Sequence, residues 1–233
     1  MAVQTVPTDR AGLENRALAA QELNQRALDR RFAADPWAWC REGTRTFDEH
    51  WKEKGTSPYE RFPAKPHLEW LMSVMRPLRR VFIPKSREIM VSWLVIAYAV
   101  WMCQWFERTR ALVQAQKEEK VIDLICGRGN PGYARTLYEQ QPPWLKARHP
   151  LTKAIEDMPG NLLTWANGST LQGVPKGADQ VRQYHPTVAI FDEAAHLDEF
   201  QESYGAADPV CSQIIAVSSA APSWFGDVVE ESI

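Results

Sequence analysis

Two consecutive acidic residues, Asp192 and Glu193, directly follow an apolar run at Thr187–Phe191. The run is typical of a buried strand in a parallel sheet, and ligands of open α/β sheets bind at the carboxyl edge. The first carboxylate could hold a hydrated Mg²⁺ ion, which prefers carboxylate and water oxygens. The second could orient and polarise the water that attacks a γ-phosphate. Acids at a strand end can also be simply solvated, so this pattern alone leaves both interpretations open.

A basic turn at Pro84–Ser92 lies upstream, between a short apolar run and a long one. A helix that begins here would offer unpaired N–H groups and its positive dipole to a phosphate. Lys85 and Arg87 bring two cations to the same turn, and either could reach the β- and γ-phosphates. A basic surface turn ahead of a core helix is the alternative interpretation.

This turn departs from the P-loop pattern G-x-x-x-x-G-K-[ST]. With Ser92 as the Mg²⁺-binding hydroxyl, Lys85 stands at the first glycine, Met90 at the second and Val91 at the lysine. Both glycines and the usual lysine are therefore absent, although the chemistry of a helix N-terminus does not require them. The candidate phosphate-binding residues are Lys85, Ser86, Arg87, Glu88, Ile89, Met90, Val91 and Ser92.

A third apolar run, Gln213–Val217, ends in Ser218 and Ser219. Small polar residues at the end of a strand could sense the γ-phosphate and transmit the change. In isolation this motif is weak.

The composition is that of an ordinary globular protein, with 233 residues, 45% of them hydrophobic and 24% charged. The net charge of −2 gives no global signature of nucleic-acid binding, so any DNA contact must be a local patch or lie in another segment. Four scattered cysteines without a CxxC pair indicate reduced thiols rather than disulfides or zinc. The segment Met1–Arg10 lacks the apolar stretch of a signal peptide.

The run Ile89–Phe106 is apolar except for Ser92 and Gln104, and it only just reaches the length of a membrane span. Its tryptophans and tyrosine lie within the run rather than in belts at its ends. We therefore expect a buried helix of an α/β core and no membrane association.

The hydrophobic pattern predicts strands that alternate with helices, and hence a mostly parallel central sheet with helices on both faces. Asn167-Gly168 is a strong hairpin signal. An amphipathic N-terminal helix is expected to lie exposed on the domain surface, with a docking arm for a partner as the alternative. The expected helices are 9–33, 66–75, 88–107, 118–126 and 133–138, and the expected strands are 81–83, 111–114, 162–165, 170–173, 187–191 and 213–217.

Together these motifs resemble the large-terminase family of tailed phages and prophages, whose motors are P-loop ATPases with an additional catalytic glutamate. The resemblance covers about residues 36–225, and it depends on the order and spacing of the motifs rather than on any one of them. The matching segments are Tyr59–Pro63 (adenine side), Pro84–Trp93 (deviant Walker A), Pro142–Leu145, Asn167–Ser169, Phe191–His196 (Walker B) and Ser218–Ala220 (coupling motif).

The resemblance implies roles for individual residues. Lys85 would bind phosphate, and Arg87 stands where some relatives keep an arginine that acts within the same subunit. Arg182 stands where others place an arginine finger for a neighbouring subunit, although this chain has Gln183 after it where the family more often has glycine. The remaining implied residues are Ser92 and Asp192 for Mg²⁺, Glu193 for catalysis, Ser218 and Ser219 for coupling, and Tyr59 and Phe62 for the adenine.

At the scale of the whole protein, the resemblance implies ATP hydrolysis that drives double-stranded DNA into a procapsid. The implied partners are DNA, a portal protein, a small terminase subunit and further copies in a ring, all in the host cytoplasm. We expect a helical extension at residues 1–55, the motor at 56–225 and the start of a linker at 226–233. No nuclease domain fits in the residues after the coupling motif, so we expect no DNA cleavage.

Two other classes stay open. One is another P-loop ATPase such as a helicase-like protein, although the sequence shows no downstream helicase motifs. The other is a nucleotide-binding module whose catalysis has decayed, which the missing glycines suggest.

Overall fold

The computed structural model describes residues 10–156 and 161–232. Its centre is a seven-stranded sheet in the order β3-β9-β8-β4-β7-β6-β5. The strands from β3 to β7 in this order are parallel to their neighbours, and β6 is antiparallel to both β7 and β5. The strands are β3 (Arg80–Pro84), β4 (Arg110–Ala115), β5 (Leu151–Ile155), β6 (Leu162–Trp165), β7 (Thr170–Gly173), β8 (Val188–Asp192) and β9 (Gln213–Ser218).

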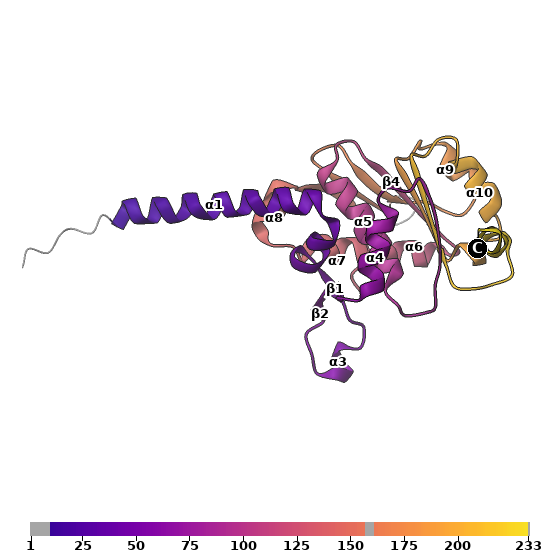
Figure 1. The fold of residues 1–233 in the computed structure, drawn as a ribbon, viewed down its shortest axis with the longest axis horizontal. Helices are drawn as coiled ribbons and strands as arrows, with labels where there is room; N and C mark the ends of the chain where they lie inside the picture. Colours follow the sequence, from indigo (N-terminus) through magenta and orange to yellow (C-terminus); the bar gives the residue numbers. More distant parts are fainter. Residues whose placement is uncertain (1–9, 157–160, 233) are drawn as a thin grey trace, which may run out of the picture.

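Helices cover both faces of this sheet (Figure 1). Successive side chains of a strand point to opposite faces, and β8 shows the consequence. Val188 and Ile190 belong to a core cluster with α4 (Pro66–Met75) and α5 (Val91–Trp105), while Ala189 and Phe191 belong to a second cluster with α10 and α11. The other helices are α1 (Arg10–Ala34), α2 (Pro36–Ala38), α3 (Trp51–Lys54), α6 (Glu118–Leu124), α7 (Tyr133–Glu139), α8 (Pro143–Arg148), α9 (Ala178–Arg182), α10 (Phe200–Ala207) and α11 (Trp224–Glu231).

The prediction of a mostly parallel α/β sheet with helices on both faces is confirmed. The helix predicted from Glu88 begins only at Val91, because Glu88 and Met90 have positive φ angles of 61° and 69°. Positive φ lies outside the right-handed helical region, so the turn cannot be part of the helix.

Several short elements were not predicted. A two-stranded antiparallel sheet joins β1 (Arg45–Phe47) to β2 (Tyr59–Arg61), with α3 between them. A π-helical turn, η1 (Trp39–Gly43), precedes β1, and a 3₁₀ turn, η2 (Ala194–His196), follows the acidic pair. The further unpredicted elements are α2, α8, β5, α9, α10 and α11, the last covering most of the predicted start of a linker.

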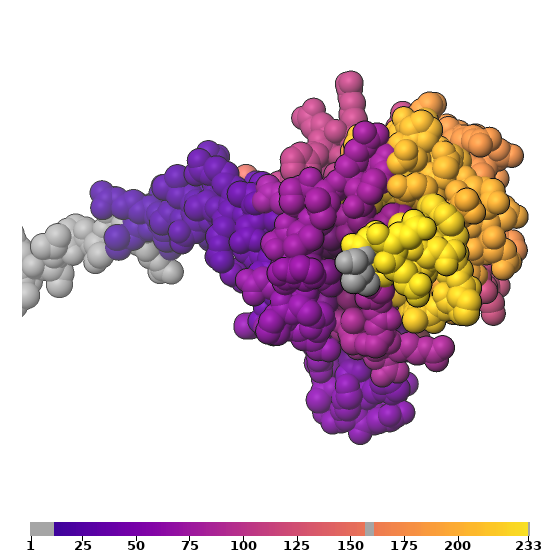
Figure 2. Space-filling view, turned by 45° about the vertical axis from the view of Figure 1, so that its right-hand side comes forward, coloured from indigo at the N-terminus to yellow at the C-terminus, as the bar shows by residue number. Residues whose placement is uncertain are grey.

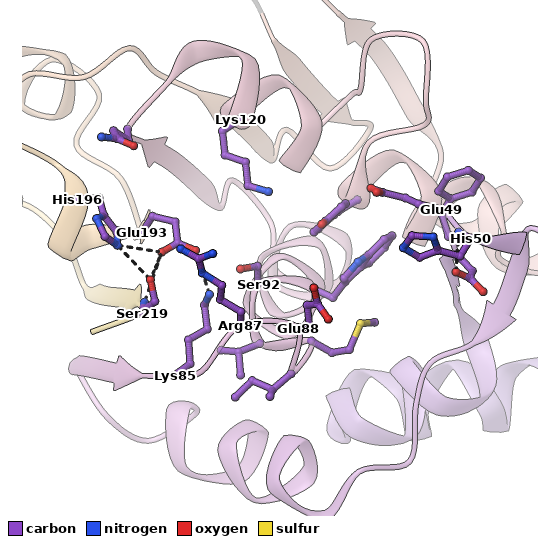
Figure 3. Close-up of a pocket in the computed structure, with 18 of the residues that line it drawn as sticks. Glu49, His50, Lys85, Arg87, Glu88, Ser92, Lys120, Glu193, His196 and Ser219 are labelled. Carbon is purple, nitrogen blue, oxygen red and sulfur yellow. Dashed lines mark hydrogen bonds and ion pairs between the residues drawn. The ribbon is translucent and has the colours of Figure 1, made fainter. Parts of the chain in front are cut away.

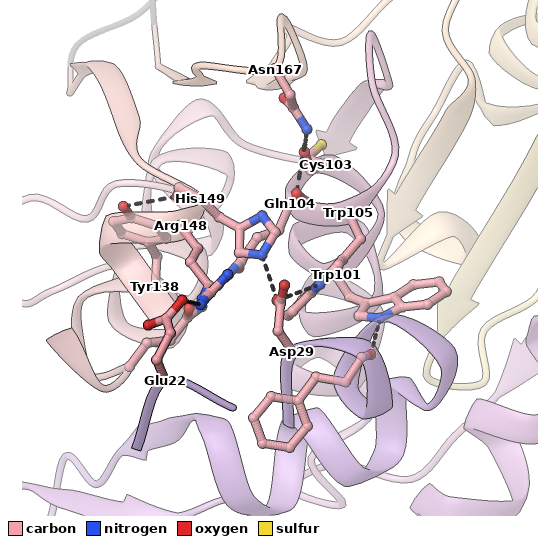
Figure 4. A network of polar contacts seen from close by, with 12 residues as sticks. Glu22, Asp29, Trp101, Cys103, Gln104, Trp105, Tyr138, Arg148, His149 and Asn167 are labelled. Carbon is pink, nitrogen blue, oxygen red and sulfur yellow. Dashed lines mark hydrogen bonds and ion pairs between the residues drawn. The ribbon is translucent and has the colours of Figure 1, made fainter. Parts of the chain in front are cut away.

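The first half of helix α1 projects from the α/β domain, and its second half packs against that domain (Figures 1 and 2). Asp29 Oδ1 lies 2.7 Å from His149 Nε2 and accepts a 3.1 Å hydrogen bond from Trp105 Nε1 (Figure 4). Trp101 Nε1 donates to the carbonyl oxygen of Phe32 at 2.8 Å. The segment between β1 and β2, which contains α3 and is called the α3 excursion below, projects away from the body and forms the lower purple part of Figure 2.

Helix α5 is almost completely buried in the core, as the interpretation of its apolar run as a core helix requires. Among the described residues, no helix combines the length and apolar character that are needed to cross a bilayer.

Candidate active site

The candidate site forms where β3, β9 and β8 end side by side. Pro84 pairs in register with Ser218, and Asp192 pairs with Val217. The backbone N–H of Lys85 donates to the Ser218 carbonyl at 2.8 Å, which ties the basic turn to the end of β9. The fold thus brings the basic turn, the acidic pair and the two serines to one edge of the sheet, where open α/β folds bind ligands.

Ser92 and Asp192 are in direct contact. Ser92 lies in the first turn of α5, and its hydroxyl donates to Asp192 Oδ1 at 2.7 Å. Asp192 is 1% exposed, and its Oδ2 has no hydrogen-bond partner in the described part of the chain. A buried carboxylate oxygen without a partner is costly, and a hydroxyl beside a carboxylate suits Mg²⁺, which also keeps several waters. The residues present therefore fit this cation.

The environment of Asp192 favours its neutral form. Burial raises the pKa of Asp192, the negative charge of Glu193 raises it further, and the Ser92 hydrogen bond opposes both effects only in part. A cation at Oδ2 would give this buried oxygen a partner, and its positive charge would offset the repulsion between the Asp192 and Glu193 carboxylates.

Glu193 lies in a different environment. Its Oε1 is 3.0 Å from Lys85 Nζ, and its Oε2 accepts a 3.1 Å hydrogen bond from the hydroxyl of Ser219. Burial alone would raise the pKa of Glu193, but Lys85 and Ser219 outweigh it and hold that pKa below its ordinary value. The Lys85 side chain is only 8% exposed, so the ion pair is largely shielded from water.

Three non-glycine residues of the site have left-handed backbone. They are Glu88 (φ 61°), Met90 (φ 69°) and Glu193 (φ 55°). Such conformations cost roughly 1–3 kcal/mol each and occur mostly at functional sites. Met90 stands at the second glycine of the P-loop pattern, so the backbone there adopts the conformation that a glycine would allow most easily.

Glu88, Met90, Ser92 and Glu193 line an open cavity of about 760 Å³ (Figure 3), whereas the buried Asp192 is not among its lining residues. One end holds Lys85, Arg87 and Glu193, while Glu49 and His50, from the loop before α3, lie at the other. Trp93 and Tyr133 stack with ring centroids 3.9 Å apart and also line the cavity.

Sequence reasoning missed His196 and Lys120. His196 Nε2 lies 3.1 Å from Ser219 Oγ and 4.0 Å from Glu193 Oε2. Its position three residues after Glu193 is the signal that could have found it. Lys120, on α6, lines the cavity, and its charge opposes the rise in the pKa of Asp192 that burial causes. The sequence gives no comparable signal for Lys120, Glu49 or His50, because tertiary packing places them here.

Other predicted site residues lie outside this cavity among the described residues. Tyr59 packs against Phe47 at 5.8 Å, and Phe62 is fully buried. Ser218 is buried and accepts a 3.0 Å hydrogen bond from the backbone N–H of Ala195. Arg182, on α9, keeps a 64% exposed side chain 3.5 Å from Asp179. Ser86 is exposed in the basic turn and does not line the cavity.

Three predicted residues of the turn, Ile89, Met90 and Val91, do line the cavity. In the described residues, three or more His, Cys, Asp or Glu side chains do not cluster anywhere as a metal centre. A zinc-type site is therefore not seen there, whereas the Ser92–Asp192 pair needs only one carboxylate.

Fold and site together define a mixed α/β protein whose parallel sheet carries a cation-rich turn opposite an acidic pair. No protein-family model matches the chain, and no curated protein matches it. Among solved structures, it is similar to the ATPase domain of the large terminase of Thermus phage P74-26, with 11% identity, a TM-score of 0.39, and coverage of 78% of this chain and 72% of that one.

A mutant of the same phage domain matches with a TM-score of 0.40 and 11% identity, over 78% of this chain and 73% of that one. These domains belong to the family that the sequence motifs resemble. A likeness this distant does not assign a function.

Proposed function

We propose that this chain is a Mg²⁺-dependent ATPase and the motor domain of a DNA-packaging large terminase, with a P-loop fold of the additional-catalytic-glutamate class. The observation that carries the proposal is the 2.7 Å contact between Ser92 and Asp192, beside the Lys85–Glu193 pair. Together they place a hydroxyl, two carboxylates and a cation around one edge of the sheet, the set that phosphoryl transfer requires.

In this mechanism Asp192 and Ser92 hold the Mg²⁺, which when bound neutralises charge on the β- and γ-phosphates. Lys85 exchanges its partner, because the triphosphate offers more negative charge than the single carboxylate of Glu193. That exchange frees Glu193 Oε1 to orient the attacking water and to accept its proton. The Ser219 hydroxyl donates to the other carboxylate oxygen, and His196 Nε2 lies 3.1 Å from that hydroxyl, so the Glu193 side chain keeps its direction when Lys85 leaves.

Arg87 is exposed on the cavity wall and would add a second cation to the phosphates. Arg182 is exposed on α9, as an arginine that serves a neighbouring copy in a ring has to be. At the scale of the assembly, hydrolysis would move the strand-end loops and drive double-stranded DNA through that ring. The proposal includes a portal protein and a small terminase subunit as partners, in the host cytoplasm.

The first test replaces Glu193 with Gln, which keeps its shape and removes its charge. Turnover of ATP should fall roughly 10²- to 10⁴-fold because the proton acceptor is lost, while binding of ATP in Mg²⁺ should not weaken. Glu202→Gln, an exposed carboxylate on α10, serves as the matched control and should keep wild-type turnover. Unchanged turnover in Glu193→Gln would refute the assignment.

A second test compares Lys85→Ala with Arg87→Ala by calorimetric titration of a non-hydrolysable ATP analogue. We expect Lys85→Ala to cost more, about tenfold or above, because its ammonium is shielded from water whereas Arg87 is exposed. A larger loss in Arg87→Ala would make the arginine the main phosphate ligand. If wild-type protein binds no nucleotide in Mg²⁺, the interpretation as a decayed module is favoured instead. DNA unwinding stimulated by ATP would favour a helicase-like protein.

A further inference from the structure

Two arginines face each other across the small sheet of β1 and β2. Arg45 pairs in register with Arg61 on the antiparallel neighbour, and both residues are exposed. Like charges directly opposite on such a pair repel each other and destabilise it. Neither guanidinium has a hydrogen-bond or ion-pair partner within the described ranges. The hairpin therefore keeps two uncompensated cations together.

A third arginine, Arg41 of η1, lies on the same cavity of about 450 Å³. Its guanidinium donates to the carbonyl oxygen of Phe62, which fixes its place beside the hairpin. Gln140, the C-cap residue of α7, also lines this cavity. Arginine and glutamine side chains that can donate hydrogen bonds thus make up half of the lining residues.

The charge of this cavity is positive. Among its described lining residues the sole acid is Glu42, and Arg31 already binds both of its carboxylate oxygens, at 2.9 Å and 2.6 Å. Three arginines therefore line the cavity without an available carboxylate, in a protein whose net charge is −2. Such a local patch is what an overall acidic chain needs in order to bind a polyanion.

We propose that this arginine cavity binds phosphate oxyanions of a nucleic-acid backbone. Guanidinium groups bind phosphate bidentately and are always charged. A bound phosphate between Arg45 and Arg61 would also replace their repulsion with two attractions. The cavity is larger than one phosphate needs, and its arginines come from three separate segments, which suits a chain of phosphates better than a single ion.

This cavity shares no lining residue with the candidate active site. The arginine site is therefore independent of ATP hydrolysis, and only the choice of duplex DNA as the probe rests on the proposed function. DNA binding without nucleotide and ATP turnover are measured separately, so failure of the ATPase proposal and failure of this one can be told apart.

The test is fluorescence anisotropy of a short labelled DNA duplex, without nucleotide, over a salt titration. Arg45→Ala and Arg61→Ala should each weaken binding roughly three- to tenfold and reduce the slope of log K against log salt by about 1. Arg16→Ala, which removes the same charge from an exposed position on α1, should stay within about twofold of the wild type. Arg45→Lys should restore the slope but only part of the affinity, because lysine cannot bind bidentately.

Equal losses in all three alanine variants would mean that only net charge matters, and the site proposal would be overturned. It would also be overturned if Arg45→Ala and Arg61→Ala bound DNA like the wild type.

A small phosphate is the other source of the same chemistry. Inorganic phosphate at matched ionic strength could raise the melting temperature of the wild type but not of Arg45→Ala. If, in addition, DNA affinity is the same in the wild type, Arg45→Ala and Arg61→Ala, the ligand is a free phosphate and the proposal of a nucleic-acid backbone fails. Cooperative melting of each variant verifies its folding.

Discussion

Asp192 and Glu193 are neighbours in the chain, yet their surroundings shift their pKa values in opposite directions. Burial raises the pKa of Asp192, whereas Lys85 holds that of Glu193 low against the effect of its own burial. Two carboxyl groups whose environments shift their pKa values apart usually have different roles in a reaction. Here the opposite shifts suit Asp192 as a carboxylate that a cation would stabilise, and Glu193 as one that stays ionised beside Lys85.

At the residue scale, the left-handed backbone of Glu88 gives a stability prediction. Its φ of 61° costs a residue with a Cβ about 1–2 kcal/mol, a cost that glycine avoids. Glycine also gains freedom in the unfolded chain, so we expect Glu88→Gly to be more stable than Glu88→Ala by roughly 0.5–1 kcal/mol in urea unfolding. Glu88→Ala is the matched control, because it loses the same carboxylate and keeps the Cβ. Equal stability of the two variants would show that the turn carries no strain.

At the scale of elements, α1 is attached through a few polar contacts between its second half and the body. Glu22 Oε1 accepts a 2.6 Å hydrogen bond from Arg148, and Asp29 contacts both His149 and Trp105 (Figure 4). Burial would raise the pKa of Asp29, but the hydrogen bond and charge of His149 outweigh it, so the folded pKa lies below the ordinary value of 3.8. The folded state therefore stabilises the ionised carboxylate.

The sign of the pH dependence comes from that lowered pKa. The contribution of Asp29 to stability is complete above its ordinary pKa and is lost as the pH falls through the lower folded value. Asp29→Asn should lower the free energy of unfolding by roughly 1–3 kcal/mol near neutral pH, and its difference from the wild type should shrink below pH 3.8. Urea melts over a pH series measure this, with Asp198→Asn, an exposed carboxylate, as the control. A difference that grows in acid would contradict the assignment.

Elements that depend on a single apolar run could be predicted from the sequence. Strands β8 and β9 are continuous buried runs, and β6 and β7 are joined at Asn167-Gly168. By contrast, β1 and β2 are three-residue strands that each begin or end in an exposed arginine, so neither alternation nor an apolar run marks them. The sequence also cannot show that Met90, which stands at the second glycine position of the P-loop pattern, has left-handed backbone.

For the candidate site, strand ends could be placed because parallel strands finish at one edge. This rule brought Ser92, Asp192 and Glu193 together. It could not place Glu49 and His50, which reach the cavity from the α3 excursion, about 140 residues from the acidic pair in sequence. Tyr59 and Phe62 were predicted at the adenine side from family order, but their rings are used in local packing.

At the scale of the whole molecule, the N-terminal segment and the sheet share one core. Phe32, Trp39 and Cys40 are at most 2% exposed and belong to the same buried cluster as α5 and β8. Strand β1 also pairs with β2 across the predicted domain boundary at residue 55. The described part of residues 1–55 therefore shares its core with the rest of the chain, and the predicted division at this point can be tested directly.

Two truncated chains provide that test. A chain that begins at residue 56 loses Trp39 and Cys40 and leaves their volumes unfilled, which should cost at least the roughly 3–5 kcal/mol typical of a Trp→Ala change in a core. This chain also loses the buried Phe32 and the β1–β2 pairing, so the summed cost should reach the roughly 5–15 kcal/mol by which a whole domain is stable, and no cooperative thermal transition is expected. A chain that begins at residue 21 keeps the Glu22, Asp29 and Phe32 contacts and should melt within a few degrees of the full chain, roughly the shift that 1 kcal/mol produces at this size. Cooperative melting of the shorter chain at the full-length temperature would show instead that residues 1–55 are an independent appendage.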